Sequence, residues 1–410
     1  MKTHHPPVYL ILIIGILLAG LLIVFIFGYG SNPEKGVRPQ REFEGGKLYR
    51  AGNIGILQLS GSYKEMGRQY GGLLKDEIQE FYTFAVDEHF IRDKGIDYGT
   101  LRVFSGMAYD KYPEKFRALM SGISETSGLP PEKVAILEQL LMIQEIEVGE
   151  GPSCSAIAAW GNYTAGGPLV LGRNFDHEPD FKKFSPYLNV VIYNPVDDIP
   201  VALVSYPGQV TSLTGMNANG VFFEANEGAK SGGSTISTDR LLLPVEMTRF
   251  LTDYPGFKEF DSAMNTTRSN YAFVVQVADK DAAYSYEASV AGIKRRGAQE
   301  PGLLVATNDF VDPAWGLTLP LDAEDKSVQR RDNLLGLANT YKGQITPDTM
   351  MQIMDTPFEE GGATWTNRTE YQVVVEPANN TLWIKTRGIQ DWVEIDLNNY
   401  FIKQGGYAKK

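Results

Sequence analysis

The chain contains a single cysteine, Cys154, which is the first candidate for chemistry. A cysteine thiolate is a strong nucleophile, but a lone cysteine is more often a small buried hydrophobic residue, so its neighbours must decide its role. Only four histidines accompany it, and two of them, His4 and His5, lie at the start of the chain. A Cys–His pair would therefore use His89 or His177, each of which also fits a structural, hydrogen-bonded role.

A second base is available without any histidine, namely the α-amine of the cysteine itself. A free α-amino group has a pKa of about 7.7–8.0 and accepts a proton at neutral pH. Pairing of a nucleophile with an N-terminal amine is an established catalytic arrangement. It requires cleavage between Ser153 and Cys154, so that Cys154 begins a mature chain. The preceding Gly-Pro-Ser segment, residues 151–153, is typical of an exposed bend that can be cut.

Signatures of several other protein classes are missing from the sequence. It has no phosphate-binding P-loop, no H-E-x-x-H zinc motif, no G-x-S-x-G elbow and no dinucleotide-binding glycine fingerprint. One cysteine excludes an internal disulfide and a cysteine-rich metal site, and we expect neither a metal nor a cofactor. The net charge of -12 argues against nucleic acid as a partner, because the phosphate backbone needs a clustered basic face.

The elements that must position Cys154 change in kind at that residue. Before it, the spacing of apolar residues predicts helices over 61–84, 101–126 and 130–147. After it, strand-like runs predominate, and Thr164–Pro168 is typical of a hairpin turn. Blocks of strands separated by pairs of helices predict an α+β fold. The expected strands are 155–160, 169–173, 188–193, 201–205, 221–224, 271–278, 282–287, 303–307, 371–376 and 381–386, and the later helices are 241–254, 257–266, 328–341 and 346–354.

The N-terminal sequence predicts a membrane anchor. Residues Val8–Tyr29 are apolar apart from glycines, and a helix of about 20 such residues crosses a bilayer. A secretory signal usually has a shorter apolar core and a small-residue cleavage site. We expect a single-pass protein whose catalytic domain lies outside the cytoplasm. The expected parts are a short tail (1–7), a transmembrane helix (8–30), a polar tether (31–47), a helical segment (48–153) and a catalytic domain (154–400).

Motifs along the chain resemble those of the N-terminal-nucleophile hydrolases. Cys154-Ser155, followed by the hairpin turn and Gly172–Asp176, resembles the opening of the penicillin acyltransferase-like family, whose relatives include acid ceramidase and the choloylglycine (bile salt) hydrolases. Gly61–Gly71 resembles the start of the acyltransferases. The resemblance covers Leu57–Ile389, and its order, beginning at the only cysteine, makes it specific. Its later motifs are Thr214–Asn217, Gly220 with Asn226-Glu227, Thr307–Asp309 and Ser327–Arg330.

The resemblance implies a four-layer αββα sandwich, with the helical first third wrapped around it and released as a separate subunit by cleavage. It also implies that Cys154 attacks the acyl carbonyl and forms a thioester. Arg173 would lie by the sulfur and favour the thiolate, since a nearby cation lowers a thiol pKa. Asp176 would orient the α-amine. The alternative for Arg173 and Asp176 is a surface ion pair, which contributes little.

Further site residues follow from the same resemblance. Asn308 would donate a hydrogen bond to the oxyanion, and Arg330 would brace the pocket, paired with Glu227. Asn217, Asn226 and Glu227 would contact the substrate. The sequence around Asn217 also fits an ordinary turn.

Three positions depart from the acyltransferase pattern. Ser155 stands where threonine is usual, Asn308-Asp309 where Asn-His is usual, and Arg173 where glutamine is usual. Bile salt hydrolases and ceramidase carry arginine at the last position. These departures affect the prediction of the acyl acceptor more than the prediction that Cys154 is the nucleophile.

The function expected from the sequence is hydrolysis of a linear amide bond in a small acyl-amide substrate. One alternative is acyl transfer to an amine, which a site outside the membrane disfavours because it meets little acyl-CoA. The other is a membrane-anchored binding protein in which Cys154 stays buried and uncleaved. The sequence does not specify the substrate.

Overall fold

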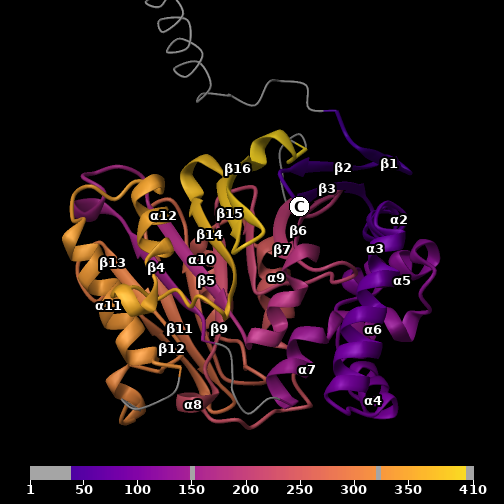
Figure 1. The fold of residues 1–410 in the computed structure, drawn as a ribbon, viewed down its shortest axis with the longest axis horizontal. Helices are drawn as coiled ribbons and strands as arrows, with labels where there is room; N and C mark the ends of the chain where they lie inside the picture. The colour runs from indigo at the N-terminus through magenta and orange to yellow at the C-terminus, as the bar shows by residue number, and fades with distance from the viewer. Residues whose placement is uncertain (1–37, 148–152, 320–324, 403–410) are drawn as a thin grey trace, which may run out of the picture. The chain divides into compact units, whose positions relative to one another are not determined.

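The computed structural model describes residues 38–147, 153–319 and 325–402, and those from Gln40 onward belong to one compact unit (Figure 1). The expected transmembrane helix (8–30) and the first part of the expected tether lie outside these ranges. Within the described ranges, no helix combines the length and apolar character needed to cross a membrane.

A ten-stranded sheet forms one half of the unit. β3 and β6 pair in parallel, and the other neighbours are antiparallel. In order across the sheet, its strands are β1 (Arg41–Phe43), β2 (Gly46–Ala51), β3 (Ile54–Gly61), β6 (Asn189–Pro195), β7 (Val201–Ser205), β8 (Thr214–Asn217), β9 (Phe222–Glu227), β10 (Phe273–Ala278), β11 (Ala283–Ser289) and β12 (Gly292–Arg296).

The first three strands were not expected from the sequence. β1 and the start of β2 fall within the segment 31–47 that was expected to be a tether, so ordered structure begins before Leu48. Arg41 and Glu42 of β1 are exposed. A short, charged edge strand resembles a polar linker in sequence, although it protects the edge of a sheet.

A six-stranded antiparallel sheet forms the other half. The expected hairpin that follows Cys154 is confirmed, with Ser155 opposite Asn174 and Ala159 opposite Val170. In order across the sheet, its strands are β13 (Leu303–Ala306), β4 (Ser155–Ala159), β5 (Val170–Asp176), β14 (Thr369–Glu376), β15 (Thr381–Thr386) and β16 (Gln390–Asp396).

The two sheets face each other, and β5 shows how the layers are built. Leu171 and Phe175 belong to the core between the sheets. A Cβ atom on Gly172 would instead lie 2.7 Å from Met354 of α12, on the opposite face. α11 (Ser327–Thr340) and α12 (Pro347–Asp355) cover the outer face of the six-stranded sheet, whereas α2 (Tyr63–Leu73), α9 (Leu243–Asp253) and α10 (Phe257–Met264) pack on the ten-stranded sheet. Helices, sheet, sheet and helices thus follow one another, and the expected mixture of helices and strands is confirmed.

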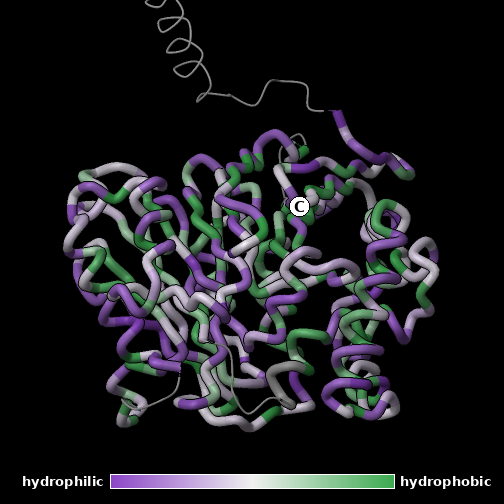
Figure 2. Tube along the Cα trace, viewed as in Figure 1, coloured by the Kyte–Doolittle hydropathy of each residue, from purple (hydrophilic) through white to green (hydrophobic). Residues whose placement is uncertain are grey.

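The helical segment expected over 48–153 begins only after β3, and its helices are more interrupted than expected. The segment 101–126 forms two helices because Pro113 cannot continue the first one. Figure 2 shows hydrophilic and hydrophobic stretches alternating along these helices, as one apolar face requires. After α2 come α3 (Lys75–Tyr82), a π-helical stretch (Thr83–Asp93), α4 (Tyr98–Tyr109), α5 (Glu114–Ser127), α6 (Pro131–Glu138), α7 (Leu140–Glu147) and a short α8 (Ala229–Gly232) beyond the site.

The Gly61–Gly71 motif owes its glycine at position 67 to helix packing. α2 begins with a capping box, in which the Ser62 hydroxyl accepts from Glu65 N and the Glu65 carboxylate accepts from Ser62 N. A Cβ atom on Gly67 would lie 2.0 Å from the Leu119 carbonyl oxygen of α5. Any larger residue would therefore push the two helices apart.

Candidate active site

The predicted cleavage residues continue the β4–β5 hairpin by two residues. Ser153 N donates to the Asp176 carbonyl oxygen at 3.2 Å, and Cys154 Sγ lies 3.6 Å from the same oxygen. Cys154 is 1% exposed and belongs to the core between the sheets. The two residues before Ser153 lie outside the described ranges. Cys154, the expected nucleophile, thus lies immediately before β4 and is held against the end of β5.

Arg173 approaches Cys154 from β5, where it shares a face with Leu171 and Phe175. Its Nη2 atom donates to the carbonyl oxygen of Ala225 in β9 at 2.9 Å, and its Nη1 atom donates to that of Leu213, which immediately precedes β8. Burial lowers the pKa of Arg173, but the charges of Tyr371, Glu224 and Cys154 outweigh it and raise the pKa. Arg173 is therefore a fully buried cation beside the thiol.

Glu224 of β9 is the carboxylate that faces Arg173. Their nearest nitrogen and oxygen atoms are 3.5 Å apart, and both side chains are fully buried. Burial raises the pKa of Glu224 to about 7, and the charge of Arg173 opposes this rise. Sequence reasoning missed this residue, although a glutamate within an apolar strand run was the available signal.

Asp176 lies at the end of β5, next to the backbone of Ser153. Its Oδ1 atom accepts from the Thr369 hydroxyl at 2.5 Å, and its buried Oδ2 atom has no hydrogen-bond partner among the described residues. Burial raises the pKa of Asp176 to about 7, although the charge of Arg330 lowers it. The carboxyl group therefore changes charge near neutral pH and has one oxygen available for a further donor.

Arg330 of α11 binds the backbone on both sides of the Cys154 α-carbon. Its Nη1 atom donates to the Ser153 carbonyl oxygen and, at 2.8 Å, to that of Cys154. Its Nε atom donates to the Asp325 carbonyl oxygen and its Nη2 atom to Asn308 Oδ1, each at 2.8 Å. Burial lowers the pKa of Arg330, and the charge of Asp176 is the largest opposing effect. The Arg330 guanidinium thus donates to the Ser153 carbonyl oxygen, which belongs to the peptide bond predicted to be cleaved.

Asn308 connects Arg330 to β9, and this corrects the expected Arg330–Glu227 pair. Asn308 Nδ2 donates to the backbone carbonyl of Glu227 at 2.8 Å. The Glu227 carboxylate instead accepts from Ala229 N at 2.5 Å and from the Tyr271 hydroxyl at 3.3 Å. Burial raises its pKa to about 7. Asn308 therefore links Arg330 to the backbone of Glu227 through one hydrogen bond to each.

The other two asparagines lie in different surroundings. Asn226 donates to Glu224 Oε1 at 3.3 Å and approaches the Thr307 carbonyl oxygen at 3.5 Å, which places it beside the Arg173–Glu224 pair. Asn217 makes four hydrogen bonds within a turn and to the end of α9. They run to the Leu251 and Tyr254 carbonyl oxygens and from Asn219 N and Val221 N, at 3.0–3.2 Å. Its polar atoms are therefore used by the turn, and its contact with a substrate stays a prediction.

The two histidines occupy an aromatic cluster. His177 Nδ1 accepts from Glu178 N at 2.9 Å, and its ring stacks on Phe181. Burial lowers the pKa of His177 to about 3, which makes it a weak base at neutral pH. The His89 ring packs edge-on against Phe184. This geometry favours the structural role for His177.

Tyr371 is a second residue near the thiol that sequence reasoning missed. Its ring stacks on Phe175 with centroids 4.7 Å apart, and its hydroxyl lies 3.0 Å from Thr214 Oγ1. Burial raises its pKa to about 12, and the charges of Arg173 and Cys154 also act on it. A tyrosine in a strand gives no sequence signal for such a position. Among the described residues, no group of His, Cys, Asp and Glu could hold a metal ion.

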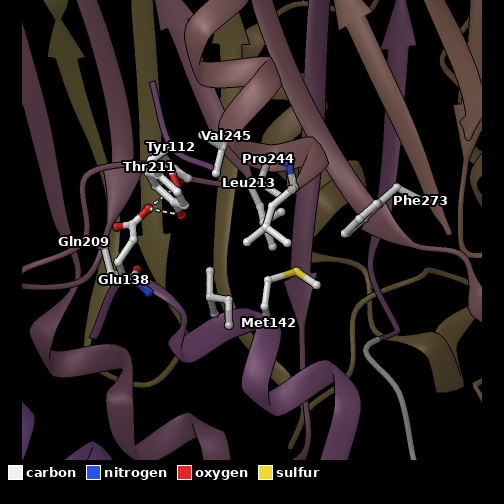
Figure 3. A pocket seen from close by; sticks show the side chains of 12 residues that line it. Tyr112, Glu138, Met142, Gln209, Thr211, Leu213, Pro244, Val245 and Phe273 are labelled. Atoms are coloured by element: carbon white, nitrogen blue, oxygen red, sulfur yellow. Dashed lines mark hydrogen bonds between the residues drawn. The ribbon is translucent and has the colours of Figure 1, made fainter. Parts of the chain in front are cut away.

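A narrow cavity lies beside this centre, bounded by Leu213, whose carbonyl binds Arg173 (Figure 3). Its water-accessible volume of about 20 Å³ has room for about one water molecule. Its walls are mostly apolar, with Glu138 at one end. The lining residues include Leu141 and Met142 of α7, together with Leu213, Leu242, Pro244, Val245 and Phe273.

Comparison with known proteins gives limited matches. No known family profile matches the chain. Protein dcd1B of Dictyostelium discoideum is 26% identical over 199 residues, which cover 42% of this chain and 38% of that protein. The chain therefore spans about two fifths of the length of this curated relative.

Similar solved structures include an amidase, a bile acid hydrolase and a penicillin acylase. They are a Caenorhabditis elegans ortholog of N-acylethanolamine-hydrolyzing acid amidase (15% identity, 55% of this chain and 93% of that chain), a mutant conjugated bile acid hydrolase from Clostridium perfringens (10%, 60% and 92%) and penicillin V acylase from Agrobacterium tumefaciens (12%, 62% and 89%), each with a TM-score of 0.42. Similarity at this level establishes neither the fold family nor the activity of the chain.

Proposed function

We propose that the chain is an amide hydrolase of the N-terminal-nucleophile type, activated by self-cleavage between Ser153 and Cys154. The observation that carries this proposal is the placement of the Arg330 guanidinium on the Ser153 carbonyl oxygen, within the peptide that ends at the thiol-bearing residue. The layered arrangement of helices and sheets agrees with the four-layer αββα sandwich of this class. The buried cation Arg173, on the sulfur side, supports thiolate formation.

Self-cleavage would begin when the Cys154 thiolate attacks the carbonyl carbon of Ser153 and closes a five-membered ring. The oxyanion on the Ser153 oxygen is stabilised by Arg330, which already donates to this oxygen. The C–N bond then breaks, the Cys154 nitrogen keeps the electron pair and takes a proton, and a thioester joins Ser153 to the sulfur. Water hydrolyses this thioester, leaving a carboxylate on Ser153 and a free amine and thiol on Cys154.

The same groups would then act on an amide substrate. The new α-amine accepts the thiol proton, as its pKa of about 7.7–8.0 allows. Asp176 Oδ2, which lacks a hydrogen-bond partner among the described residues, would accept from this amine. The sulfur attacks the substrate carbonyl, the leaving amine takes the proton, and an acyl thioester forms on Cys154. Water releases the acid and restores the thiol.

Arg330 would also donate to the oxyanion of the substrate, because the departure of Ser153 frees its Nη1 atom. Asn308 was expected to provide this hydrogen bond. In the uncut chain its amide donates to the Glu227 carbonyl and its oxygen accepts from Arg330. We therefore propose that Asn308 holds Arg330 in position, and that the backbone carbonyl of Glu227 holds Asn308 in position. Direct donation by Asn308 stays a prediction.

The cavity beside Leu213 would receive the acyl part of the substrate, because its walls are mostly apolar. Its present volume is too small for an acyl chain, and Leu141 and Met142 of α7 form part of its wall. Cleavage after Ser153 makes α7 the last described helix of the first fragment. A shift of this helix would then widen the cavity.

A panel of N-acyl aminocoumarins with acyl chains of increasing length tests the proposed activity. The self-cleaved protein should release the fluorescent amine, with a preference for apolar acyl groups, and Cys154→Ala should release none. Release of the amine at the wild-type rate by the Cys154→Ala variant would exclude Cys154 as the nucleophile. A lack of release from every amide, by protein that has cut itself, would exclude the proposed class of substrate.

We further propose that residues 8–30 anchor the chain as a single membrane-spanning helix, with the catalytic unit outside the cytoplasm. The apolar run supports the anchor. Protease added outside intact cells should digest the catalytic unit. Complete protection, with digestion only after the cells are opened, would contradict this orientation.

A further inference from the structure

A buried carboxyl group outside the Cys154 centre lies at the end of α6. Glu138 is 6% exposed, and Figure 3 shows it with Tyr112 and Thr211 at one end of the cavity. Its Oε1 atom accepts from the Tyr112 hydroxyl at 3.0 Å and from the Thr211 hydroxyl at 2.5 Å. Its Oε2 atom accepts from Val210 N at 2.6 Å. The proposed reaction uses none of these groups directly.

Two of the three partners of Glu138, Val210 and Thr211, belong to the loop of residues 206–213, which joins β7 to β8. The helical segment before Cys154 holds this loop at several further points. Gln209 Nε2 donates to the Leu137 carbonyl oxygen at 3.3 Å, and Gly208 N donates to the Tyr70 hydroxyl at 3.2 Å. Among these hydrogen bonds between the loop and the helical segment, only those to Glu138 involve a charged group. The loop therefore takes its position from helices that precede the cleavage site.

The same loop ends at the catalytic centre. The carbonyl oxygen of Leu213, two residues after Thr211, accepts a hydrogen bond from the Arg173 guanidinium. Arg173 in turn faces Cys154, and the charge of Cys154 is one of the effects that raise the pKa of Arg173. A continuous path thus runs from Glu138 to the thiol. It passes through the Thr211 hydroxyl, the backbone of residues 211–213 and the Arg173 guanidinium.

We propose that Glu138 is a positioning residue that couples the helical segment to the reaction, by fixing the loop that orients Arg173 beside Cys154. This inference rests on the proposed function, because it assigns the helical segment a role in the chemistry of Cys154. It implies that the first fragment remains bound after cleavage and is required for full activity.

The electrostatics of the site make this coupling sensitive to pH. Burial raises the pKa of Glu138 to about 7, and its partners are a backbone N–H and two hydroxyl groups rather than a cation. The titratable groups that face it are the phenols of Tyr112, Tyr70 and Tyr193, and burial raises the pKa of each above 10. As the pH falls through about 7, Glu138 gains a proton, one of its oxygens becomes a donor, and the loop loses an acceptor.

Glu138→Gln keeps the size of the side chain but removes the charge and one acceptor. Glu132→Gln is the matched control, because Glu132 lies on the same helix, is exposed and accepts a hydrogen bond from the Tyr98 hydroxyl rather than from the loop. The readout is the titration of protein labelled with [3-¹³C]cysteine, with all variants compared in the same covalent state, uncut or fully cut, as intact mass shows. The single cysteine gives one signal, whose shift follows the thiol pKa without any need for amide hydrolysis.

We expect the Cys154 thiol pKa to rise by about one unit in Glu138→Gln, and self-cleavage at pH 7 to slow by about tenfold, with Glu132→Gln unchanged. Thr211→Val is the second variant, because it removes one partner and leaves the carboxylate in place; a smaller shift in the same direction is expected. Failure of Glu138→Gln to cut itself, while Glu132→Gln does so, also supports the coupling. Identical thiol titrations and cleavage rates in all variants would overturn it.

These outcomes separate this inference from the proposed function. A thiol titration that depends on Glu138 in a chain that never cuts itself would retain the coupling and reject self-cleavage. A chain that cuts itself and hydrolyses amides, but whose thiol ignores Glu138, would retain the function and reject the coupling.

Discussion

Two arginines approach Cys154 from adjacent layers, a sheet and the helices that cover it, and they differ in what they bind. Arg173 comes from β5 and is anchored on the ten-stranded sheet, by two backbone carbonyls and by Glu224. Arg330 comes from α11 on the outer side of the six-stranded sheet, and its hydrogen bonds go to neutral acceptors. The pKa of Arg173 is raised, whereas burial lowers that of Arg330. The first arginine has a carboxylate partner and faces the sulfur, whereas the second donates to the Ser153 carbonyl, where we propose that cleavage occurs.

This difference indicates a division of labour between two buried cations. A cation near sulfur changes the fraction of thiolate, which depends on pH. A donor on a carbonyl oxygen stabilises the charge that develops during attack, and its effect does not depend on thiol ionisation. Variants of the two arginines should therefore fail in different ways.

Replacement of Arg330 should have the largest effect on self-cleavage after loss of the thiol itself. In Arg330→Gln, we expect cleavage to slow by about 10²–10³-fold, the loss seen when one oxyanion donor is removed from an enzyme. Arg330→Lys should recover only part of the rate, since a lysine cannot bind two carbonyls in a fixed fork. Time courses of intact mass measure the rate. Arg331→Gln is the control, because Arg331 pairs with exposed Asp332, and equal rates in the two glutamine variants would contradict the assignment.

Replacement of Arg173 should give a smaller loss that alkaline pH restores. In Arg173→Gln, the thiol pKa should return toward about 8.5, so cleavage at pH 7 should slow by about tenfold and recover near pH 9. Arg330→Gln should not recover over the same range. The division of labour would be wrong if both variants, or neither, were rescued by alkaline pH.

Asn308→Ala tests whether Asn308 acts through Arg330. Loss of the amide removes one of the groups that orient the guanidinium, so cleavage should slow by about tenfold. The double variant with Arg330→Gln should be no slower than Arg330→Gln alone, because residues in one network are not additive. Multiplication of the two losses would instead indicate that Asn308 acts independently, as direct donation to the oxyanion requires.

The stability of the chain should fall as the pH rises toward 7. The pKa values of Asp176 and Glu224 are raised to about 7, so the folded state keeps protons that the unfolded state has already lost above about pH 4–5. The free energy of unfolding therefore decreases with rising pH in this window and levels off above about 7. The Tm of the Cys154→Ala chain, measured between pH 5 and 8, should show a fall that Asp176→Asn reduces. A Tm difference between the chain with and without Asp176→Asn that stays constant from pH 5 to 8 would show that Asp176 is not protonated in the fold.

The organisation of the hairpin that follows Cys154 was predictable from local sequence patterns, whereas Arg330 and Asn308 were expected only from the family resemblance. The turn at Thr164–Pro168 and the apolar runs on either side predict β4 and β5, which places Arg173 and Asp176 near Cys154. β1 was missed because an edge strand with Arg41 and Glu42 has the composition of a linker. The contact of Arg330 with the Ser153 carbonyl depends on how α11 packs over β4, and a single sequence does not encode such a distance in any local pattern.

The smallest effect on chemistry is expected at Asn217. Its side chain is occupied by the turn after β8 and by the end of α9, so Asn217→Ala should lower the free energy of unfolding by about 1–3 kcal/mol. Self-cleavage and amide hydrolysis at low temperature should stay at the wild-type rate. A raised KM in a stable Asn217→Ala protein would instead support the substrate contact expected from the sequence.

The most direct test of the account is the intact mass and N-terminal sequence of the purified chain beside its Cys154→Ala variant. We predict two fragments in the wild type, one of which begins with Cys154, and a single uncut chain in the variant. An uncut wild-type chain under all conditions, or cleavage of both proteins at the same bond, would contradict self-activation through Cys154.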